Sequence, residues 1–361
     1  MTGRGIDQVL PHPGDPELHE PYLTSARRYV DIAQRANGPF PVPVSFDYVW
    51  GDALPELERQ APDARIVNLE TSVTRSEHYW RDKGIHYRMH PSNAPCLTAA
   101  KIDCCVLANN HVLDWGRDGL VETLATLKSF GIKTAGAGAN GAQAQAPAII
   151  DLAERGRVVV FGIGLPSSGI PIDWAAGESV SGVNLLTDLS DDTVRRIGAQ
   201  ARLAKRNRDI AIASIHWGEN WGYDVPREQR RFAHALIDGA DVDVVHGHSS
   251  HHVKAIEVYR DKLILYGCGD LLTDYEGIRG YERYRGDLGL MYFPTIDART
   301  GRLVRLQMTP TKVRRFRINR AALSDARWLA HRLTQEGARF GTHVDVDADG
   351  RLELRWRRSE E

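Results

Sequence analysis

Short apolar segments alternate with amphipathic stretches between residues 65 and 245, and this pattern predicts alternating strands and helices. The apolar segments are nearly continuous, which is typical of strands that are buried on both faces. The predicted strands are Arg65–Leu69, Ile102–Ala108, Val158–Gly162, Ile210–Ile215 and Val242–Val245. The predicted helices are Thr24–Ala36, Ser92–Ala100, Asp118–Phe130, Leu186–Arg208 and Pro226–Asp238. We therefore expect an α/β protein with a sheet that helices cover on both faces.

From residue 253 onwards the pattern becomes that of β-structure. The predicted strands there are Lys254–Tyr259, Lys262–Tyr266, Gly289–Thr295 and Leu303–Thr309, with Arg260–Asp261 as a hairpin turn. The tail predicts a helix near Asp325–Glu336 and a strand near Arg351–Arg357. We expect one large domain, residues 1–310, and a helix–strand appendage, residues 311–361.

The composition is that of a soluble globular protein and excludes several classes of function. A formal net charge of −1 argues against binding to nucleic acid or to an anionic membrane through bulk charge. No apolar run is long enough for a membrane anchor, and Met1–Leu10 lacks the apolar core of a signal peptide. The four cysteines lack zinc-site spacing, which favours a reducing, cytoplasmic environment.

Polar side chains cluster where four of the predicted strands end. These groups are Asn68 and Glu70; Asn109, Asn110, His111 and Asp114; His216 and Glu219; and His246, His248, His251 and His252. Because the carboxyl ends of parallel strands line one edge of a sheet, we expect these side chains to meet in one crevice. Six of the 14 histidines lie between residues 216 and 252, which strengthens this expectation.

Each group also has an ordinary structural interpretation. A single histidine after a strand is usually a surface or capping residue, Asn109–Asn110 suits a turn, and a glutamate such as Glu70 is usually solvated. Four such groups at the same topological position favour a metal site instead.

Imidazole, carboxylate and amide oxygen ligands suit divalent Zn, Mn or Fe, and two such ions about 4 Å apart can hold a hydroxide and a phosphoryl oxygen. Glu70 is placed to bridge the two ions and Asn110 to bind one of them. The other expected metal ligands are His216, His248 and His251. His111 is then a general acid or a stabiliser of charge beside the reacting group.

Several motifs together resemble the CapA-type poly-γ-glutamate capsule synthesis proteins, the PGA_cap family. The first are Asn68-Leu69-Glu70 and Ala108-Asn109-Asn110-His111, with Asp114 and Gly116. The match continues through Gly136 and Gly138, His216-Trp217-Gly218, Gln229 with Ala233, Asp238 to Asp241, Gly247 to His251, and Glu257 to Gly269. The resemblance runs from Gly3 to about residue 310.

This resemblance implies a calcineurin-like metallophosphoesterase fold, a four-layer sandwich of two mixed β-sheets flanked by helices. The late β-rich segment would then form the second sheet. It also implies a centre of two divalent metal ions (Mn, Fe or Zn) that hydrolyses a phosphoester or related bond, with His111 and Asp114 as catalytic residues. The residues implied to bind substrate are Asn68, Asn109, Arg4, Glu219 and Asp270.

The chain departs from the family pattern at three places. The family begins with a strand ending in Gly-Asp ahead of the match to Gly3-Arg4, and Met1 stands where that strand would finish. We expect a start codon assigned too late or a truncation, with apolar partners and unpaired sheet groups exposed by the loss. Ser249 stands where the family has the first histidine of a pair, so that His248 or His252 would substitute. Gly269-Asp270-Leu271 replaces the family's Gly-Asn-Phe.

Two functions remain open alongside an inactive scaffold that has lost the metals. One is metal-dependent hydrolysis of a phosphorylated or polyanionic substrate. The other is a non-catalytic subunit that binds an anionic polymer such as polyglutamate, or its synthase. A polymer channel would need clustered positive charge, and the only candidate is the run Lys312, Arg314, Arg315, Arg317 and Arg320. Such a run more often forms a solvated strand face.

Overall fold

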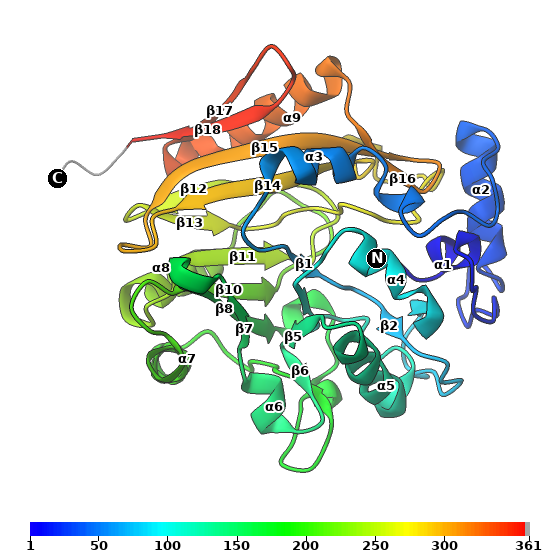
Figure 1. Cartoon of the computed structure of the whole chain (residues 1–361), viewed down its shortest axis with the longest axis horizontal. Coiled ribbons are helices and arrows are strands. Elements are labelled where there is room, and N and C mark those ends of the chain that lie inside the picture. Colours follow the sequence, from blue (N-terminus) through cyan, green and yellow to red (C-terminus); the bar gives the residue numbers. More distant parts are fainter. Residues whose placement is uncertain (358–361) are drawn as a thin grey trace.

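Parallel strands form the centre of the molecule, and the computed structural model describes residues 1–357 of the chain. A six-stranded mixed sheet has the order β12-β13-β11-β10-β8-β7 (Figure 1). Its strands are β7 (Ala148–Asp151), β8 (Arg157–Gly164), β10 (Ile210–His216), β11 (Val244–His248), β12 (Ile256–Tyr259) and β13 (Lys262–Leu265). A three-stranded parallel sheet consists of β1 (Ile66–Asn68), β4 (Cys104–Val106) and β5 (Lys133–Ala135).

A third sheet is antiparallel and has the order β14-β15-β18-β17, with β16 also paired to β15. Its strands are β14 (Leu288–Ile296), β15 (Leu303–Arg314), β16 (Arg317–Arg320), β17 (Thr342–Val346) and β18 (Leu352–Trp356). Two short pairs complete the β-structure: β2 (Ser72–Val73) with β3 (Arg88–Met89), and β6 (Ala137–Gly138) with β9 (Gly182–Val183).

Helices cover the outer faces of these sheets. They are α1 (Gly5–Val9), α2 (Arg27–Asn37), α3 (Ala53–Gln60), α4 (Pro95–Ala99), α5 (Gly116–Ser129), α6 (Gly141–Gln145), α7 (Asp191–Ala204), α8 (Arg227–Gly239) and α9 (Leu323–Gly337). The apolar faces of α7 and α8 pack on the six-stranded sheet, where Ile197 and Phe232 join a core with Ile215. Helix α9 covers the antiparallel sheet through Leu329 and Leu333.

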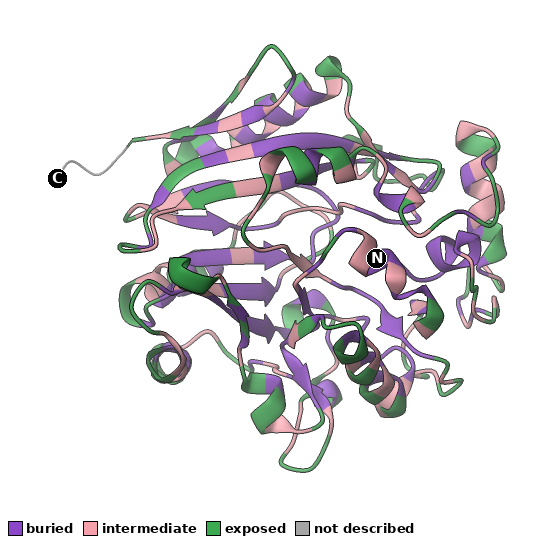
Figure 2. Cartoon of the chain, in the orientation of Figure 1, coloured by how far each residue is buried: buried purple, intermediate pink, exposed green. Residues whose placement is uncertain are grey.

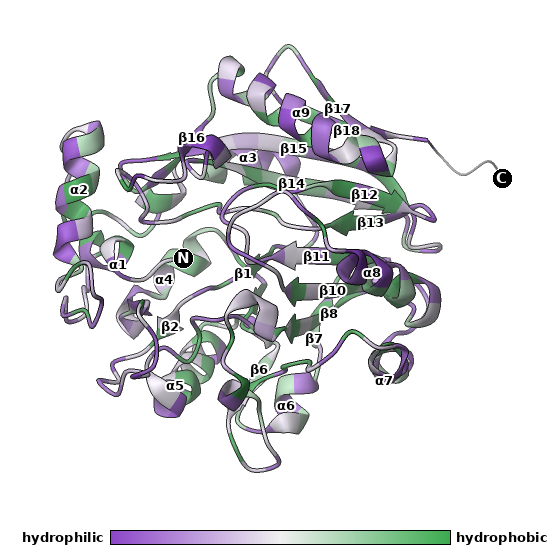
Figure 3. Cartoon of the chain, turned by 180° about the vertical axis from the view of Figure 1, so that it is seen from behind, coloured by the Kyte–Doolittle hydropathy of each residue, from purple (hydrophilic) through white to green (hydrophobic). Residues whose placement is uncertain are grey.

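The pattern of burial follows this layered arrangement. Figure 2 shows the central strands buried and the outward sides of the covering helices exposed. Figure 3 shows the same contrast in hydropathy, with hydrophobic strands in the six-stranded sheet and a hydrophilic outer face on α8. None of the helices within residues 1–357 is long and apolar enough to cross a membrane.

The structure confirms a mixed α/β fold of several sheets flanked by helices. The predicted hairpin at Arg260–Asp261 is present: both residues have positive φ, and Tyr259 pairs directly with Lys262. However, this hairpin does not belong to a second sheet, as we expected for the late β-rich segment. Its second strand, β13, pairs in parallel with β11, so the hairpin extends the six-stranded sheet.

Two predicted helices begin later than expected. In the predicted helix Ser92–Ala100, His90 rather than Ser92 supplies the capping side chain, to a 3₁₀ turn, and α4 starts at Pro95. Helix α7 starts after Ser190, whose side chain accepts a hydrogen bond from the Thr193 amide. A side-chain cap therefore marks the start of α7, whereas α4 starts at a proline without a side-chain cap.

The C-terminal residues are built into the antiparallel sheet. Strand β15 runs through position 310, where we expected the first domain to end, and pairs with β18 through Gln307 and Met308. Thr342, at the start of β17, donates a hydrogen bond to Ile256 O. The tail therefore shares its sheet and core with the preceding residues.

Candidate functional site

The carboxyl ends of four parallel strands bring the predicted polar residues together. Strand β1 pairs with β4 so that Asn68 lies opposite Val106, and the chain then continues to Glu70 and to Asn109–His111. Strand β10 pairs with β11 so that His216 lies opposite His248. The two pairs belong to separate sheets, and the contact between His216 Nε2 and Asn110 Oδ1 shows that their carboxyl ends meet, as the sequence predicts.

Three histidines form one hydrogen-bonded row on β10 and β11, with His216 and His248 buried and His246 half-buried. His246 Nδ1 lies 2.9 Å from Ser214 Oγ, which lies 3.0 Å from His248 Nε2. His248 Nδ1 lies 2.8 Å from His216 Nδ1, and His216 Nε2 lies 3.1 Å from Asn110 Oδ1. Burial lowers the pKa of His216 and His248 well below the usual value, and that of His246 to about 4. All three rings are therefore neutral at pH 7.

This row separates the roles of His216 and His248. Both ring nitrogens of His248 are engaged, one by Ser214 and the other by His216. His216 instead turns Nε2 toward Asn110 Oδ1, and the same nitrogen lies 3.9 Å from Glu70 Oε1. His248 thus contacts Nδ1 of His216 and helps to orient that ring, and its expected role as a metal ligand stays a prediction.

A chain of amide side chains fixes Glu70. Asn109 donates to Leu69 O at 2.9 Å and to Asn68 Oδ1 at 3.0 Å, and Asn68 donates to Glu70 Oε2 at 2.9 Å. Burial raises the pKa of Glu70, although nearby His251 opposes this effect. Asn68 and Asn109, which we expected to bind substrate, connect the loop after β4 to the carboxylate at the end of β1.

His111 and Asp114 form a second buried cluster with Lys83. His111 Nδ1 lies 2.6 Å from Asp114 Oδ2, and the Lys83 ammonium contacts Asp114 Oδ1, the Asn110 carbonyl and, at 3.3 Å, His111 Nδ1. Asp114 also accepts the Tyr87 amide at 2.7 Å. Burial lowers the pKa of His111 to about 4, and Lys83 adds to this effect. The neutral ring donates from Nδ1 to Asp114, which leaves Nε2 as an acceptor.

His251 forms an ion pair with Asp270. Its Nδ1 lies 3.1 Å from Asp270 Oδ2, and this carboxylate raises the pKa of His251 although burial opposes the shift. Both Asp270 and His251 act electrostatically on Glu70, so the pair lies beside Glu70 in the same cluster.

Two expected substrate-binding residues, Arg4 and Glu219, differ in their surroundings. Arg4 is 3% exposed, and its guanidinium is held by Asp274, Glu20 and the Tyr29 hydroxyl. It packs behind His111, from which the Tyr87 ring separates it. Buried carboxylates thus engage the Arg4 guanidinium, and its expected role in substrate binding stays a prediction. Glu219 is exposed in the loop after β10.

Ser249, which departs from the family's histidine, and His252, one of its two expected substitutes, both contact neighbouring loop backbone. Ser249 donates to the Gly218 carbonyl at 3.0 Å. Both ring nitrogens of His252 are engaged, by Val253 O and by the Gly222 amide. These residues hold the loops after β10 and β11 together.

Two of the five residues of the basic run on β15 and β16 pair with acidic side chains. Lys312 pairs with Asp287 and Asp325, and Arg317 pairs with Asp52. These contacts offset the positive charge of Lys312 and Arg317, which a channel for an anionic polymer would need.

Sequence reasoning missed two residues of the site, Lys83 and Ser214. Ser214 carried a usable signal, because a lone hydroxyl two residues before His216 in an apolar strand lies on the same face of the sheet. Lys83 comes from an irregular loop of residues 76–87, and nothing in its sequence neighbourhood indicates the contact with Asp114.

The donor atoms suit a divalent cation only when Asn110 is included. Within residues 1–357, no group of three His, Cys, Asp or Glu side chains is arranged to hold a metal ion. Glu70 Oε1 and Asn110 Oδ1 lie 3.9 Å and 3.1 Å from His216 Nε2. Ligands about 2.1 Å from a tetrahedral ion lie about 3.4 Å apart, so this spacing fits one ion.

Comparisons with known proteins show a family whose model covers the candidate site. The family model described as "Bacterial capsule synthesis protein PGA_cap" matches residues 1–275, a range that includes every site residue named above except those of the basic run. A "Probable polyglutamine synthesis accessory protein" of Mycobacterium tuberculosis is 46% identical over 355 residues, which cover 98% of this chain and 93% of the relative.

Two capsule biosynthesis proteins are more distant relatives. The "PGA biosynthesis protein CapA" of Bacillus subtilis is 28% identical over 70% of this chain and 62% of its own length. The "Capsule biosynthesis protein CapA" of Bacillus anthracis is 25% identical over 63% of this chain and 54% of its own length.

Proposed function

Because the chain belongs to the PGA_cap family of bacterial capsule synthesis proteins, we propose that it serves the synthesis of a polyglutamate or related capsule polymer. We propose further that it does so as a metal-dependent hydrolase of a phosphoester or related bond. The names of its relatives support the first part. The second part rests on one observation, the convergence of Glu70, Asn110 and His216.

In this proposal, Glu70, Asn110 and His216 hold one divalent ion, either Mn, Fe or Zn. Glu70 and His251 would hold a second ion, and Asp270 would orient the His251 ring. The bound ions supply positive charge against a phosphoryl oxygen and acidify water. His248 orients His216 through the contact between their Nδ1 atoms, and Asn68 orients Glu70.

His111 supplies the proton-transfer group in this reaction. Its contact with Asp114 fixes the ring with Nε2 as an acceptor, which suits removal of a proton from an attacking water. Lys83 holds Asp114 and the Asn110 carbonyl together, so that it positions the catalytic base and one expected metal ligand. The substrate is phosphorylated or polyanionic, since positive ions would dominate the charge of the crevice.

The test of catalysis is hydrolysis of bis(p-nitrophenyl) phosphate by the metal-loaded chain. We expect His111→Gln to lower kcat by about 10²- to 10⁴-fold, the usual contribution of a positioned base, without loss of folded protein. His78→Ala is the matched control, because the His78 side chain is 85% exposed and pairs only with exposed Asp118 among the ion pairs of residues 1–357. Equal turnover by the wild-type chain and His111→Gln would remove His111 from the mechanism. Absence of turnover in the wild type would favour a binding role.

A further inference from the structure

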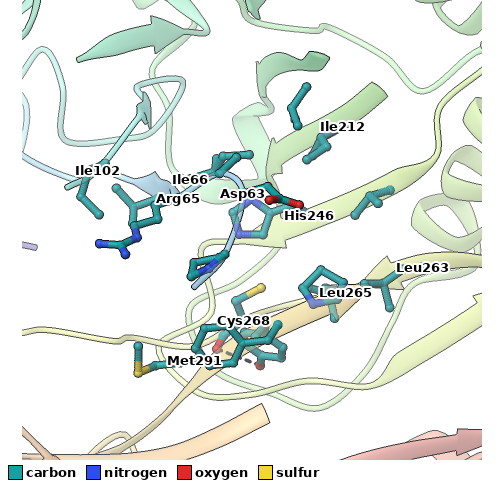
Figure 4. Close-up of a pocket in the computed structure, with 18 of the residues that line it drawn as sticks. Asp63, Arg65, Ile66, Ile102, Ile212, His246, Leu263, Leu265, Cys268 and Met291 are labelled. Carbon is teal, nitrogen blue, oxygen red and sulfur yellow. Dashed lines mark hydrogen bonds between the residues drawn. The ribbon is translucent and has the colours of Figure 1, made fainter. Parts of the chain in front are cut away.

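The side from which a substrate reaches the candidate site follows from what surrounds its polar residues. An apolar cavity of about 940 Å³ adjoins Glu70, and Figure 4 shows walls such as Ile66 and Leu265 around it. Apolar walls cannot replace the water that a phosphorylated or polyanionic substrate gives up. Neither His111 nor His251 is among the residues that line this cavity. We therefore expect a substrate to approach on the side of these two histidines.

Two tyrosines connect these histidines and form one wall of the site. The ring centroids of Tyr87 and His111 lie 4.7 Å apart, and those of Tyr275 and His251 lie 5.1 Å apart, both edge to face. The side chains of Tyr87 and Tyr275 are hydrogen-bonded to each other. The wall therefore runs from the expected catalytic base to an expected ligand of the second ion. A reacting group held between the two histidines would lie against this wall.

The Tyr275 hydroxyl lies beside the expected ligand atom of His251. Asp270 engages Nδ1 of this ring, and the Tyr275 oxygen lies 3.5 Å from Nε2. A separation of 3.5 Å is at the limit of a hydrogen bond, so this contact engages the O–H only weakly. A phenol is protonated at pH 7 and can donate one hydrogen bond. The hydroxyl can therefore donate to a substrate oxygen.

Buried carboxylates fix the backbone on either side of Tyr275. Asp274 accepts two hydrogen bonds from the Arg4 guanidinium, at 2.7 and 3.0 Å. Glu276 accepts two backbone amides of the turn between β15 and β16, at 2.6 and 2.9 Å. A donor that is held in place before the substrate arrives needs no reorganisation during the reaction, which makes it effective against developing charge.

A purely structural role explains the ring of Tyr275 better than its hydroxyl. A phenyl ring would make the same edge-to-face contact with His251. Asp270 already holds the His251 ring, at 3.1 Å, so the weaker contact with Tyr275 is not needed to orient it. The contact with Tyr87 does not use up the hydroxyl either, since a hydroxyl can accept one hydrogen bond and donate another.

We propose that the Tyr275 hydroxyl binds the substrate and donates a hydrogen bond to a non-bridging oxygen of the reacting phosphoryl group. Asp274 and Arg4 are positioning residues for this hydroxyl. Tyr275 neither gains nor loses a proton in this role, and no bond forms or breaks on it. The inference rests on the proposed hydrolase function and adds to it a residue that holds the group on which His111 and the ions act.

The experiment uses Tyr275→Phe, which removes only the hydroxyl. The matched control is Tyr292→Phe, because Tyr292 is also half-buried and its hydroxyl donates to Cys268 O at 3.1 Å. Both variants and the wild type are loaded with manganese, and their metal content is measured by mass spectrometry. Calorimetry measures the binding of inorganic phosphate. Turnover is measured with bis(p-nitrophenyl) phosphate and with diphenyl phosphate, which has the poorer leaving group.

We expect Tyr275→Phe to bind phosphate about 10- to 100-fold more weakly than the wild type, the usual contribution of a hydrogen bond to a charged group. Its kcat/KM should fall by a similar factor. That factor should be the same for both diesters, because the hydroxyl does not act on the leaving group. The metal content of Tyr275→Phe should equal that of the wild type, and Tyr292→Phe should match the wild type in phosphate binding and turnover.

Equal phosphate binding by Tyr275→Phe and the wild type, or binding by neither, would overturn the proposal. Loss of metal from Tyr275→Phe would also overturn it, because Tyr275 would then act through His251. So would a larger loss of kcat/KM with diphenyl phosphate, because the hydroxyl would then donate a proton to the leaving group. If the wild type bound phosphate more tightly than Tyr275→Phe but showed no turnover, the hydrolase proposal would fail while the contact between Tyr275 and the anion would stand.

Discussion

Replacing Arg4 by methionine tests whether this residue stabilises the fold rather than binds substrate. The Arg4 guanidinium donates to both oxygens of Asp274, at 3.0 and 2.7 Å, and to Glu20 at 3.1 Å. All three side chains are at most 2% exposed, and the guanidinium also packs over the Tyr29 and Tyr87 rings. Methionine keeps much of the apolar volume and removes the charge, so that two buried carboxylates lose their cation.

The expected loss of stability is large. Removing one partner of a buried ion pair costs about 3–5 kcal/mol, because the remaining charge stays buried. An unfolding entropy of about 2.1 cal/mol/K per residue gives about 0.76 kcal/mol/K for 361 residues. The unfolding temperature of Arg4→Met should therefore fall by about 4 to 7 °C.

Differential scanning calorimetry at pH 7 measures this shift. The matched control is Arg28→Met, which removes the Arg28–Asp31 pair, whose side chains are 65% and 48% exposed. It should change the free energy of unfolding by less than about 1 kcal/mol. Adding Glu20→Gln and Asp274→Asn to Arg4→Met should recover part of the stability. An Arg4→Met shift as small as that of the control would refute the assignment of Arg4 to a structural network.

Two further predictions concern stability. Burial alone would raise the pKa of Glu56, but hydrogen bonds from Arg59 and Thr309 lower it from 4.5 to about 2. The stability from ionised Glu56 is therefore present above pH 4.5 and is lost as the pH falls toward 2. The free energy of unfolding of Glu56→Gln should therefore depend less steeply on pH between 4.5 and 2 than that of the wild type. Identical pH dependence of the two proteins across that window would contradict this. A Cβ at Gly162 would lie 2.6 Å from the Cα atom of Gly136, which links β5 and β6. Gly162→Ala should therefore lower the free energy of unfolding, measured by urea denaturation, by about 1–3 kcal/mol. Gly84→Ala, where a Cβ meets nothing within 4 Å, should be nearly neutral, and equal midpoints for the two variants would count against this packing argument.

Local sequence pattern was sufficient to locate the main strands and the edge where the polar residues meet. Apolar runs such as Ile210–Ile215 and Val242–Val245 became β10 and β11 because only a buried strand suits so continuous a run. Once these strands are parallel, His216 and His248 must lie side by side. The meeting of the strand ends was thus predictable from a few positions.

The roles of individual side chains depend on contacts that local pattern does not contain. Arg4 lies 270 residues from Asp274 in sequence, and only the folded chain shows that this carboxylate engages its donors. His216 and His248 both end a strand, but the His248 ring contacts Ser214 through one nitrogen and His216 through the other. The turn residues Arg260–Asp261 predicted the hairpin, but nothing in the local sequence predicted that it would pair with β11.

Metal content after reconstitution tests the central claim most directly. The chain is loaded with Mn, Fe or Zn, desalted, and measured by mass spectrometry beside His216→Ala and the control His343→Ala, whose residue is exposed on β17. We predict two ions per chain in the wild type and in His343→Ala, with metal lost from His216→Ala. No stoichiometric metal in the wild type, or equal content in all three proteins, would contradict the metal centre at Glu70, Asn110 and His216.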